Sequence, residues 1–319
     1  MMALMGSEGP CEVSVVMSVY NGAQHLRQTL DSILAQRDVA FELVVIDDGS
    51  IDGSAATLEE YARGDTRIRV IRQENRGLTR ALITGCSEAR APYIARHDCG
   101  DTSHADRLRK QKEALDRDPG IAFVSCWTTM VGPGGELLFT AQGSGAAATE
   151  PMWILDPSQT WGTKDGPSRH AAVMFRVDAY RKAGGYRPEF YYGQDWDLWY
   201  RLAEHGKFRM IPEALYTANF DVGTISAGAR VAQQKLAKLS LAAMKARARG
   251  EPETEILRRA ANVGKQKAPL CAEARGLYFI GEVLRRNDNV RARHYFLQAI
   301  RSCPCHAKAW LRLAQTIIR

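Results

Sequence analysis

The 319-residue sequence lacks several patterns that mark common classes of protein. No apolar run reaches roughly eighteen residues, so no membrane-spanning helix is expected. The N-terminus has neither a basic region nor a long apolar core, which predicts that there is no signal peptide. No basic run is interleaved with aromatic residues, so no nucleic-acid partner is expected. Together these absences predict a cytoplasmic protein, with at most peripheral contact at the inner face of the membrane.

Two patterns of nucleotide chemistry are also missing. No GxGxxG motif follows a predicted strand, which argues against a dinucleotide oxidoreductase. The turn at Tyr20-Asn21-Gly22 is not a glycine-rich loop with a basic residue, which argues against a nucleotidyltransferase. The net charge of +7 and the pI of about 9.1 nevertheless favour an anionic partner, such as a nucleotide diphosphate or an anionic lipid surface.

The seven cysteines include no CxxC pair. Their odd number and irregular spacing are typical of reduced thiols in a cytosolic protein. The pattern nearest to a zinc motif is Cys303-Pro304-Cys305-His306. Its spacing is wrong for zinc and no second pair accompanies it, so we expect no metal there.

Short apolar runs alternate with amphipathic segments over the first half of the chain. Strands are predicted at 13–19, 41–46, 67–71, 93–95, 121–126 and 171–176, and helices at about 54–63, 78–89, 106–115 and 194–205. A further helix is predicted after the turn at 20–22, with Leu26, Leu30, Ile33 and Leu34 on one face. Such alternation predicts an α/β domain with a mostly parallel central sheet wrapped by helices. Residues 132–169 are irregular and rich in glycine, and Trp153 and Trp161 favour a functional lid in this segment.

The composition changes after about Ser226, which predicts an α/β domain at 1–228 and an all-α region at 229–319. The tail from about residue 270 is typical of a helical hairpin. The positions that match a tetratricopeptide second helix are Ala292, Phe296, Ala299 and Pro304, with Trp310 where a next repeat would begin. Because a repeat needs a neighbour to bury its apolar face, we expect this hairpin to pack on the rest of the chain or on a second copy. Partner recognition and structural support both remain open as its role.

Two acidic turns follow predicted strands, one at residues 47–50 and one at residues 98–101. Ligands of open α/β sheets bind at the carboxyl ends of the strands. Two carboxylate clusters at one such edge predict a site for a cation and the phosphates that it bridges. The alternative is that the aspartates only form turns. Similarly, Asp195 and Asp197 lie in the first turn of a predicted helix, where capping is an alternative role.

Several ordered motifs resemble those of the family 2 glycosyltransferases, which have a Rossmann-like GT-A fold. They are the strand and turn at 13–22, the acidic turn at 41–50, the segment at 74–81, Arg96-His-Asp-Cys-Gly-Asp101, and Tyr192-Gly-Gln-Asp-Trp-Asp-Leu-Trp199. The resemblance covers the first 230 residues or so. It implies an inverting transferase that moves a sugar from a nucleotide-diphosphate donor, by family frequency a UDP-sugar, to a hydroxyl of a saccharide or lipid-linked saccharide. The implied setting is synthesis of a surface polysaccharide or glycoconjugate.

The resemblance also implies roles for individual residues. Asp195 is the implied catalytic base, and Asp98 and Asp101 are implied ligands of Mn²⁺ or Mg²⁺. The implied nucleotide-sugar-binding set is Val19, Tyr20, Asn21, Asp47, Asp48, Asn75, Gly77, Arg80 and Asp98.

The sequence departs from the family pattern at three places. Gly100 replaces the second aspartate of the metal-binding DxD signature, and Gln194 replaces the glutamate before the base. Asp221 stands where a late histidine often completes the metal site. We hypothesise that Asp221 is a third metal ligand, and the alternative is an aspartate in a loop turn. Gly100 and the repeat together favour a second function, a catalytically degenerate fold that binds or scaffolds partners through its helical tail, with self-association through that tail.

Overall fold

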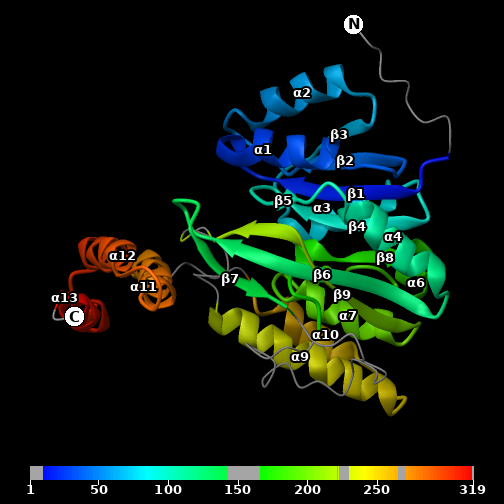
Figure 1. Ribbon diagram of the computed structural model, residues 1–319. Helices are drawn as coiled ribbons and strands as arrows, with labels where there is room; N and C mark the ends of the chain where they lie inside the picture. Colours follow the sequence, from blue (N-terminus) through cyan, green and yellow to red (C-terminus); the bar gives the residue numbers. More distant parts are fainter. Residues whose placement is uncertain (1–9, 143–165, 221, 223–229, 265–270, 318–319) are drawn as a thin grey trace, which may run out of the picture.

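The computed structural model describes residues 10–142, 166–220, 222, 230–264 and 271–317. In these residues a mixed, mostly parallel sheet of nine strands forms the centre of the molecule, as predicted (Figure 1). Its first four strands are parallel to one another. They are β1 (Val13–Val19), β2 (Phe41–Asp47), β3 (Ile68–Arg72) and β4 (Tyr93–Asp98), in the spatial order β3-β2-β1-β4.

The remaining strands extend this sheet beyond β4. They are β5 (Thr102–Ser103), β6 (Ile121–Val131), β7 (Leu137–Ala141), β8 (Met174–Arg176) and β9 (Lys207–Asn219). Strand β8 is antiparallel to both β4 and β6, whereas β9 runs parallel to β6. Strands β5, β7 and β9 were not predicted from the sequence, and β7 lies within residues 132–169, which were expected to be irregular. The predicted strand at 171–176 begins only at Met174, after a short 3₁₀ helix at His170–Ala172.

Helices cover both faces of the sheet. They are α1 (Ala23–Leu34), α2 (Ser54–Gly64), α3 (Leu78–Ser87), α4 (Arg107–Arg117), α6 (Val177–Lys182) and α7 (Gln194–Ala203). Their apolar residues recur at helical spacing, so that one face of each long helix is buried. Strand β1 shows that the sheet is buried on both sides, because Val15 and Val16 belong to different apolar clusters.

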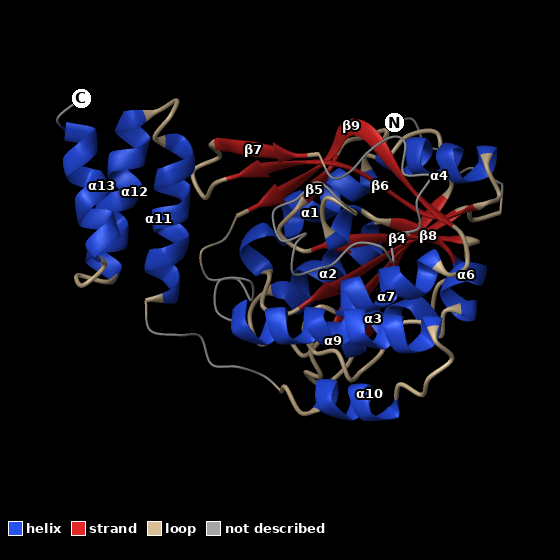
Figure 2. Cartoon of the chain, turned by 90° about the horizontal axis from the view of Figure 1, so that it is seen from below, coloured by secondary structure: helices blue, strands red, loops and turns tan. Residues whose placement is uncertain are grey.

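The C-terminal helices form two groups. Helices α9 (Arg230–Ala248) and α10 (Thr254–Ala261) pack beside α7. Helices α11 (Ala272–Leu284), α12 (Asn289–Ser302) and α13 (Ala307–Ile317) form a separate three-helix bundle, which we call the tail bundle. Both views show the tail bundle beside the tip of the β6–β7 hairpin and away from α9 and α10 (Figures 1 and 2). Its assignment as a tetratricopeptide repeat stays a prediction.

The tail bundle packs on the rest of the chain through specific contacts. The Tyr295 hydroxyl donates a hydrogen bond of 2.7 Å to Oε1 of Glu136 at the tip of the β6–β7 hairpin, and both side chains are buried. The ring of Phe279 from α11 stacks on Phe220, with 5.2 Å between centroids, and meets Phe139 edge to face at 6.4 Å. The expected packing of the tail on its own chain is therefore observed.

The cysteines differ from the prediction. Cys271 and Cys303 form a disulfide between the start of α11 and the end of α12, so the prediction of reduced thiols is wrong for this pair. The sequence could not reveal the pairing, because the two residues are 32 positions apart and meet only when the helices pack. As expected, no helix in the described part of the chain is long and apolar enough to cross a membrane. The predicted lid residues Trp153 and Trp161 lie outside the described residues.

Candidate active site

The carboxyl ends of three parallel strands bring the acidic turns together. In the register of the sheet, Val19 of β1 is paired with Asp47 of β2, and Ser18 is paired with Asp98 of β4. Adjacent strands lie about 4.8 Å apart. The turns that leave β1, β2 and β4 therefore share one edge of the sheet, where the sequence predicted a ligand site.

Asp48 is fully engaged by the chain itself. Its Oδ1 accepts hydrogen bonds from Nε2 of Gln73 at 2.6 Å and from the amide of Arg76 at 2.9 Å. Its Oδ2 accepts one from the amide of Gly77 at 2.8 Å. Hydrogen bonds to a carboxylate are stronger than neutral ones. Asp48 thus fixes the 73–77 turn, which carries two other predicted binding residues, Asn75 and Gly77.

Asp47 is different, because one of its oxygens lacks a hydrogen-bond donor. The residue is completely buried, and its Oδ1 accepts a bond of 2.9 Å from the amide of Ser50. Its buried Oδ2 has no hydrogen-bond donor among the described residues, although Nε of Arg72 lies 3.3 Å away. A buried carboxylate oxygen in this state is an acceptor available to a ligand at the edge of the sheet.

The β1–α1 turn faces the same edge. Asn21 adopts a positive φ of 52°, and its Oδ1 accepts a bond of 2.9 Å from the amide of Ile51. Its own amide donates to Oγ of Ser50 at 3.0 Å, so the turns after β1 and β2 are joined. Tyr20 in this turn is half exposed, with 52% of its surface open to solvent. Arg80, from α3, is also exposed.

The second acidic turn is built around a buried arginine. Oδ1 of Asp98 lies 2.5 Å from a terminal nitrogen of Arg96, whose side chain is buried. Partial burial opposes ionisation of Asp98, but the guanidinium charge outweighs it and lowers the pKa of the carboxyl below its ordinary value. Asp98 therefore stays charged, with 43% of its side chain exposed to solvent.

Asp101 lies deeper in the same turn. Its Oδ1 accepts a bond of 3.0 Å from the amide of Asn219, the last residue of β9. Burial and the nearby charge of Asp98 raise the pKa of Asp101 to about 7. Two carboxylates thus lie close together in a site that does not fully compensate their charge.

Gly100 separates these two carboxylates along the chain. Its φ is +101°, a conformation that residues with a side chain rarely adopt, and a Cβ atom there would meet no other atom within 4 Å. The side-chain amide of Asn219 donates to the Gly100 carbonyl. The glycine is therefore required by the backbone and is not simply a missing ligand. The hypothesised compensating ligand, Asp221, lies outside the described residues.

Asp195 lies in the first turn of α7, after Gly193, which caps the helix in a left-handed conformation with φ of 67°. Burial raises the pKa of Asp195 to about 6, with the nearby Arg96 acting to lower it and Asp98 to raise it. Asp195 is therefore within electrostatic range of Arg96 and of Asp98 in the second acidic turn. A carboxyl with a pKa near the working pH suits a general base.

Asp197 has a purely structural environment. It is buried and paired with Arg201 at 2.5 Å, and Arg187 lies 3.7 Å from its other oxygen. The pair with Arg201 lies within α7, and the contact with Arg187 joins the helix to the segment that leads to it. Of the two aspartates in the first turn, only Asp195 therefore interacts with the acidic turns at the sheet edge.

Two basic residues of the site were missed in the sequence. The positive charge of exposed Arg169 acts on both Asp98 and Asp101, lowering the pKa of each carboxyl. His170 binds the Tyr186 hydroxyl through Nε2 at 2.7 Å, and burial lowers its pKa to about 3, so its ring is neutral. No motif marks either residue, because only the tertiary packing of the chain brings them to the acidic turn. Arg96, in contrast, belongs to the motif at residues 96–101, where it is a charged residue at the end of an apolar run.

The site lies at the open edge of the sheet. A separate cavity of about 300 Å³ is lined by Glu204, Met244, Arg247 and Ala248. It lies at the end of α7 opposite Asp195 and contains none of the predicted site residues.

Comparisons with known proteins agree with these features. Residues 14–184 match the sequence model of the family described as "Glycosyl transferase family 2". The protein named putative glycosyltransferase EpsE, from Bacillus subtilis (strain 168), is 34% identical over 221 residues, which cover 67% of this chain and 75% of that protein.

Solved structures share the fold. TarS 1–349 of S. aureus in complex with UDP-GlcNAc superposes with a TM-score of 0.54 and 15% identity, covering 91% of this chain and 89% of that one. The mannosyltransferase PcManGT from Pyrobaculum calidifontis in complex with GDP-Man and Mn²⁺ gives a TM-score of 0.52 and 16% identity, covering 98% of this chain and 86% of that one. At these identities the likeness shows the fold alone.

Proposed function

Because this chain belongs to glycosyl transferase family 2, we propose that it is an inverting transferase that moves a sugar from a nucleotide-diphosphate donor to an acceptor hydroxyl. One observation carries the proposal. Asp98 and Asp195, which come from different elements, both interact with the buried Arg96 guanidinium, and Asp101 lies beside Asp98. A cluster with one charged carboxylate and one of raised pKa has the two kinds of group that this transfer needs.

The first acidic turn is the proposed nucleoside end of the site. The buried Oδ2 of Asp47 lacks a hydrogen-bond donor and can accept an N–H of a nucleobase. Half-exposed Tyr20 and exposed Asn75 lie in the turns beside it and offer surfaces for the base and ribose. Arg80 and Arg169 are exposed cations that can pair with the diphosphate.

The second acidic turn is the proposed metal end. Asp98 and Asp101 fit Mg²⁺ or Mn²⁺, because such ions are commonly held by one or two carboxylates together with phosphates of the substrate. When bound, the cation would neutralise charge on the leaving diphosphate. Asp221 remains our proposed third ligand. The raised pKa of Asp101 beside the charged Asp98 supports this assignment, since a cation would relieve the repulsion between the two carboxylates.

Asp195 is the proposed base. As the acceptor hydroxyl attacks the anomeric carbon, its proton passes to the Asp195 carboxylate, and the bond from that carbon to the diphosphate oxygen breaks. The first turn of α7 holds Asp195 in place, since its Oδ1 accepts the amide hydrogen of Trp196 at 2.9 Å. A single displacement of this kind inverts the anomeric centre. The raised pKa makes Asp195 a stronger base than an ordinary carboxylate.

The proposed donor is a UDP-sugar. One fold relative was solved with UDP-GlcNAc and another with GDP-Man, so both donor classes are tested below. The proposed acceptor is a saccharide or lipid-linked saccharide of a surface polysaccharide or glycoconjugate. A lipid-linked acceptor would require only peripheral contact with the inner face of the membrane, to which the net charge of +7 is suited.

A donor panel tests the proposal. The melting temperature is measured with UDP, GDP, dTDP and CMP, each with Mn²⁺ and with a chelator. A ligand at about 100 times its Kd stabilises the fold by roughly 2.7 kcal/mol, which a melting curve resolves. One nucleotide should stabilise the wild type in the presence of Mn²⁺, and Asp101→Asn should abolish the Mn²⁺-dependent part. The matched control is Asp178→Asn, an exposed aspartate of α6.

The alternative function is a binding or scaffold protein of the same fold. The observation that favours it is Gly100, which removes one carboxylate from the usual signature. If no nucleotide raises the melting temperature with or without metal, the transferase proposal fails and the scaffold function is preferred. If sugar transfer occurs, NMR of the product's anomeric proton decides between inversion and retention.

A further inference from the structure

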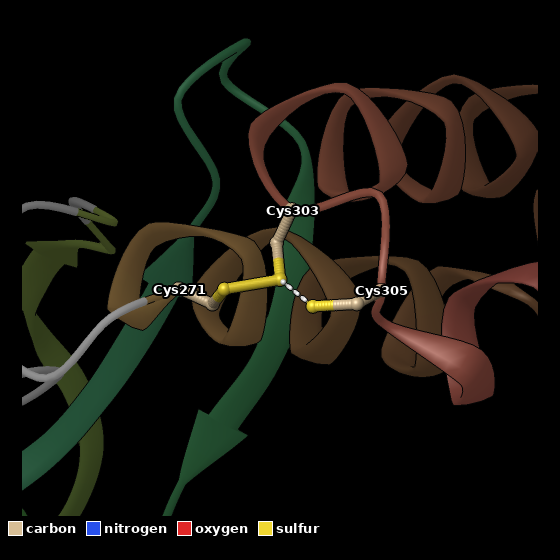
Figure 3. Close-up of side chains that lie close together, drawn as sticks. All are labelled: Cys271, Cys303 and Cys305. Carbon is tan, nitrogen blue, oxygen red and sulfur yellow. Dashed lines mark hydrogen bonds between the residues drawn. A yellow bond between two sulfur atoms is a disulfide. The ribbon is translucent and has the colours of Figure 1, made fainter.

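Three cysteines of the tail bundle converge on one point (Figure 3). Cys271 precedes α11, Cys303 follows α12, and Cys305 lies in the turn before α13. Their sulfur atoms all lie within 4.8 Å of one another. Cys271 and Cys303 form the disulfide, and Sγ of Cys305 lies 3.4 Å from Sγ of Cys303. A structural disulfide uses only two sulfurs, so the third requires another explanation.

The surroundings favour thiolates once the disulfide is reduced. Cys271 occupies the N-terminal cap of α11, a helix of 13 residues, and Cys305 is two residues before α13, a helix of 11 residues. The positive end of a helix dipole lowers the energy of a nearby thiolate. Three thiolates so close together would repel one another strongly unless a cation lies between them.

We propose that the reduced cluster of Cys271, Cys303 and Cys305 is a binding site for a thiophilic divalent cation of the Zn²⁺ class. Zinc binds thiolates at about 2.3 Å in a tetrahedron, which places sulfur ligands roughly 3.8 Å apart. The separation of 3.4 Å between Cys303 and Cys305, and the upper limit of 4.8 Å for all pairs, are close to this arrangement. Reduction of the Cys271–Cys303 bond would free these two sulfurs to move apart to this spacing.

The fourth position of the tetrahedron belongs to water or to a ligand from solution. His306 is adjacent, but its Nδ1 accepts the amide hydrogen of Ala309 at 3.2 Å, and its ring lies 5.0 Å from that of Tyr278. The histidine is therefore used in the first turn of α13. The site thus has three sulfur ligands from the chain and one exchangeable position.

The chemistry is balanced by a thiol or phosphine reductant. The reductant takes up the oxidising equivalents of the Cys271–Cys303 disulfide and leaves two thiols, which join the thiol of Cys305. The cation then displaces the thiol protons as it binds. Metal and disulfide are alternative links between the same helices, because both join the start of α11 to the end of α12. The metal would also bind Cys305 and so join the turn before α13 to the other two helices.

The test uses the full-length protein, reduced with a phosphine and kept free of oxygen. Co²⁺ is titrated as a spectroscopic probe, and Zn²⁺ is then added in competition with a chromophoric chelator. We expect a sulfur-to-cobalt charge-transfer band, displaced by one equivalent of Zn²⁺ per chain. Co²⁺ bound at the carboxylates of the candidate active site gives no such band. The oxidised protein should show none.

The decisive variant is Cys305→Ser, which keeps the two cysteines of the disulfide. Its affinity for Zn²⁺ should fall by more than the roughly tenfold loss typical of an outer-shell change. Cys11→Ser, a free cysteine outside the cluster, is the matched control and should bind as the wild type does. The proposal is overturned if the reduced wild type gives no sulfur-to-cobalt band, or if Cys305→Ser gives an equal one. Exchange of the disulfide to Cys303–Cys305 without metal binding would likewise reject it.

Discussion

The two acidic turns at the edge of the sheet use the same residue type in opposite ways. In the first turn, Asp48 accepts three hydrogen bonds from its own chain, and the aspartate is part of the framework. In the second turn, Asp98 and Asp101 lie beside one another with their charge incompletely balanced. An aspartate that follows a strand can therefore either stabilise a turn or be available to a ligand. Its hydrogen-bond partners distinguish the two roles.

This comparison separates stability from activity. Loss of a framework carboxylate should lower the free energy of unfolding, whereas loss of a carboxylate from the second turn or from α7 should mainly impair ligand binding or chemistry. Proteins commonly carry such unfavourable arrangements where they bind and react. Four measurements test this distinction between stability and activity, in order of decreasing expected effect.

The largest effect is expected for Asp195→Asn. Removal of a general base lowers the rate by about 10²- to 10⁴-fold, so kcat should fall by that factor while donor affinity changes little. Nucleotide-sugar turnover and donor binding are measured on the same preparation. Asp178→Asn, an exposed aspartate of α6, is the control. Retention of more than about a tenth of wild-type turnover would exclude Asp195 as the base.

A large effect on stability is expected for Asp48→Asn. The amide would direct its N–H groups at backbone donors, and the free energy of unfolding should fall by about 3 kcal/mol. Chemical denaturation measures this change. Asp101→Asn is the comparison variant, because the raised pKa of Asp101 means that its charge is unfavourable in the fold, so its loss should reduce metal-dependent donor binding more than stability. Equal destabilisation by both substitutions would contradict the distinction between the turns.

The pH dependence provides a third measurement. The pKa of Asp195 is raised from its ordinary value of 3.8 to about 6 in the folded protein, because the carboxyl is buried. The unfolded chain therefore ionises first, and the folded state loses stability as the pH rises from about 4 to 6. Asp195→Asn should raise the free energy of unfolding above pH 6, by roughly 1–3 kcal/mol, and have no such effect near pH 4. Wild-type kcat should rise through about pH 6.

Unfolding curves at several pH values check the sign of this effect. If Asp195→Asn is less stable than the wild type at neutral pH, the carboxylate is stabilising and the environment described above is incorrect. If kcat does not change through about pH 6, the group that titrates during turnover is not Asp195.

The smallest effect is expected in the tail bundle. Phe279 stacks on Phe220. Asn219, which precedes Phe220, donates hydrogen bonds to the carboxylate of Asp101 and to the carbonyl of Gly100. An aromatic pair contributes about 0.5–1.5 kcal/mol, so Phe279→Ala should weaken metal-dependent donor binding by a few-fold. Trp310→Ala removes another exposed aromatic residue of the tail and is the control. Identical donor affinities for the two variants would mean that the tail does not influence the second turn.

Much of the α/β fold could be predicted from local patterns. The helix at 23–34 and the strand at 41–47 follow directly from apolar residues at helical spacing and from a run of buried β-branched residues. Parallel strands also predict where their turns meet, which is why Asp47 and Asp98 were expected at one edge. These features depend on near neighbours in the sequence or on a general rule of topology.

Other features depend on contacts between distant segments. Strand β9 was missed because it pairs with β6, some 86 positions earlier at its start, and its pattern is interrupted by Pro212 and polar residues. Arg169 and His170 reach the site through tertiary packing, and no spacing rule connects them to Asp98. The disulfide between Cys271 and Cys303 arises from helix packing in the same way. The different roles of Asp47 and Asp48 likewise cannot be predicted from the sequence, because they depend on the hydrogen-bond partners of each carboxylate.

The backbone at Gly100 limits how this turn could be redesigned. There is open space around the missing Cβ, so volume does not prevent substitution by aspartate. The obstacle is the φ of +101°, which an aspartate would strain unless the whole turn adopted a new path. That path would also disturb the bonds from Asn219. Introducing a second carboxylate at this position therefore needs coordinated changes in the turn, and a single substitution of Gly100 should strain it.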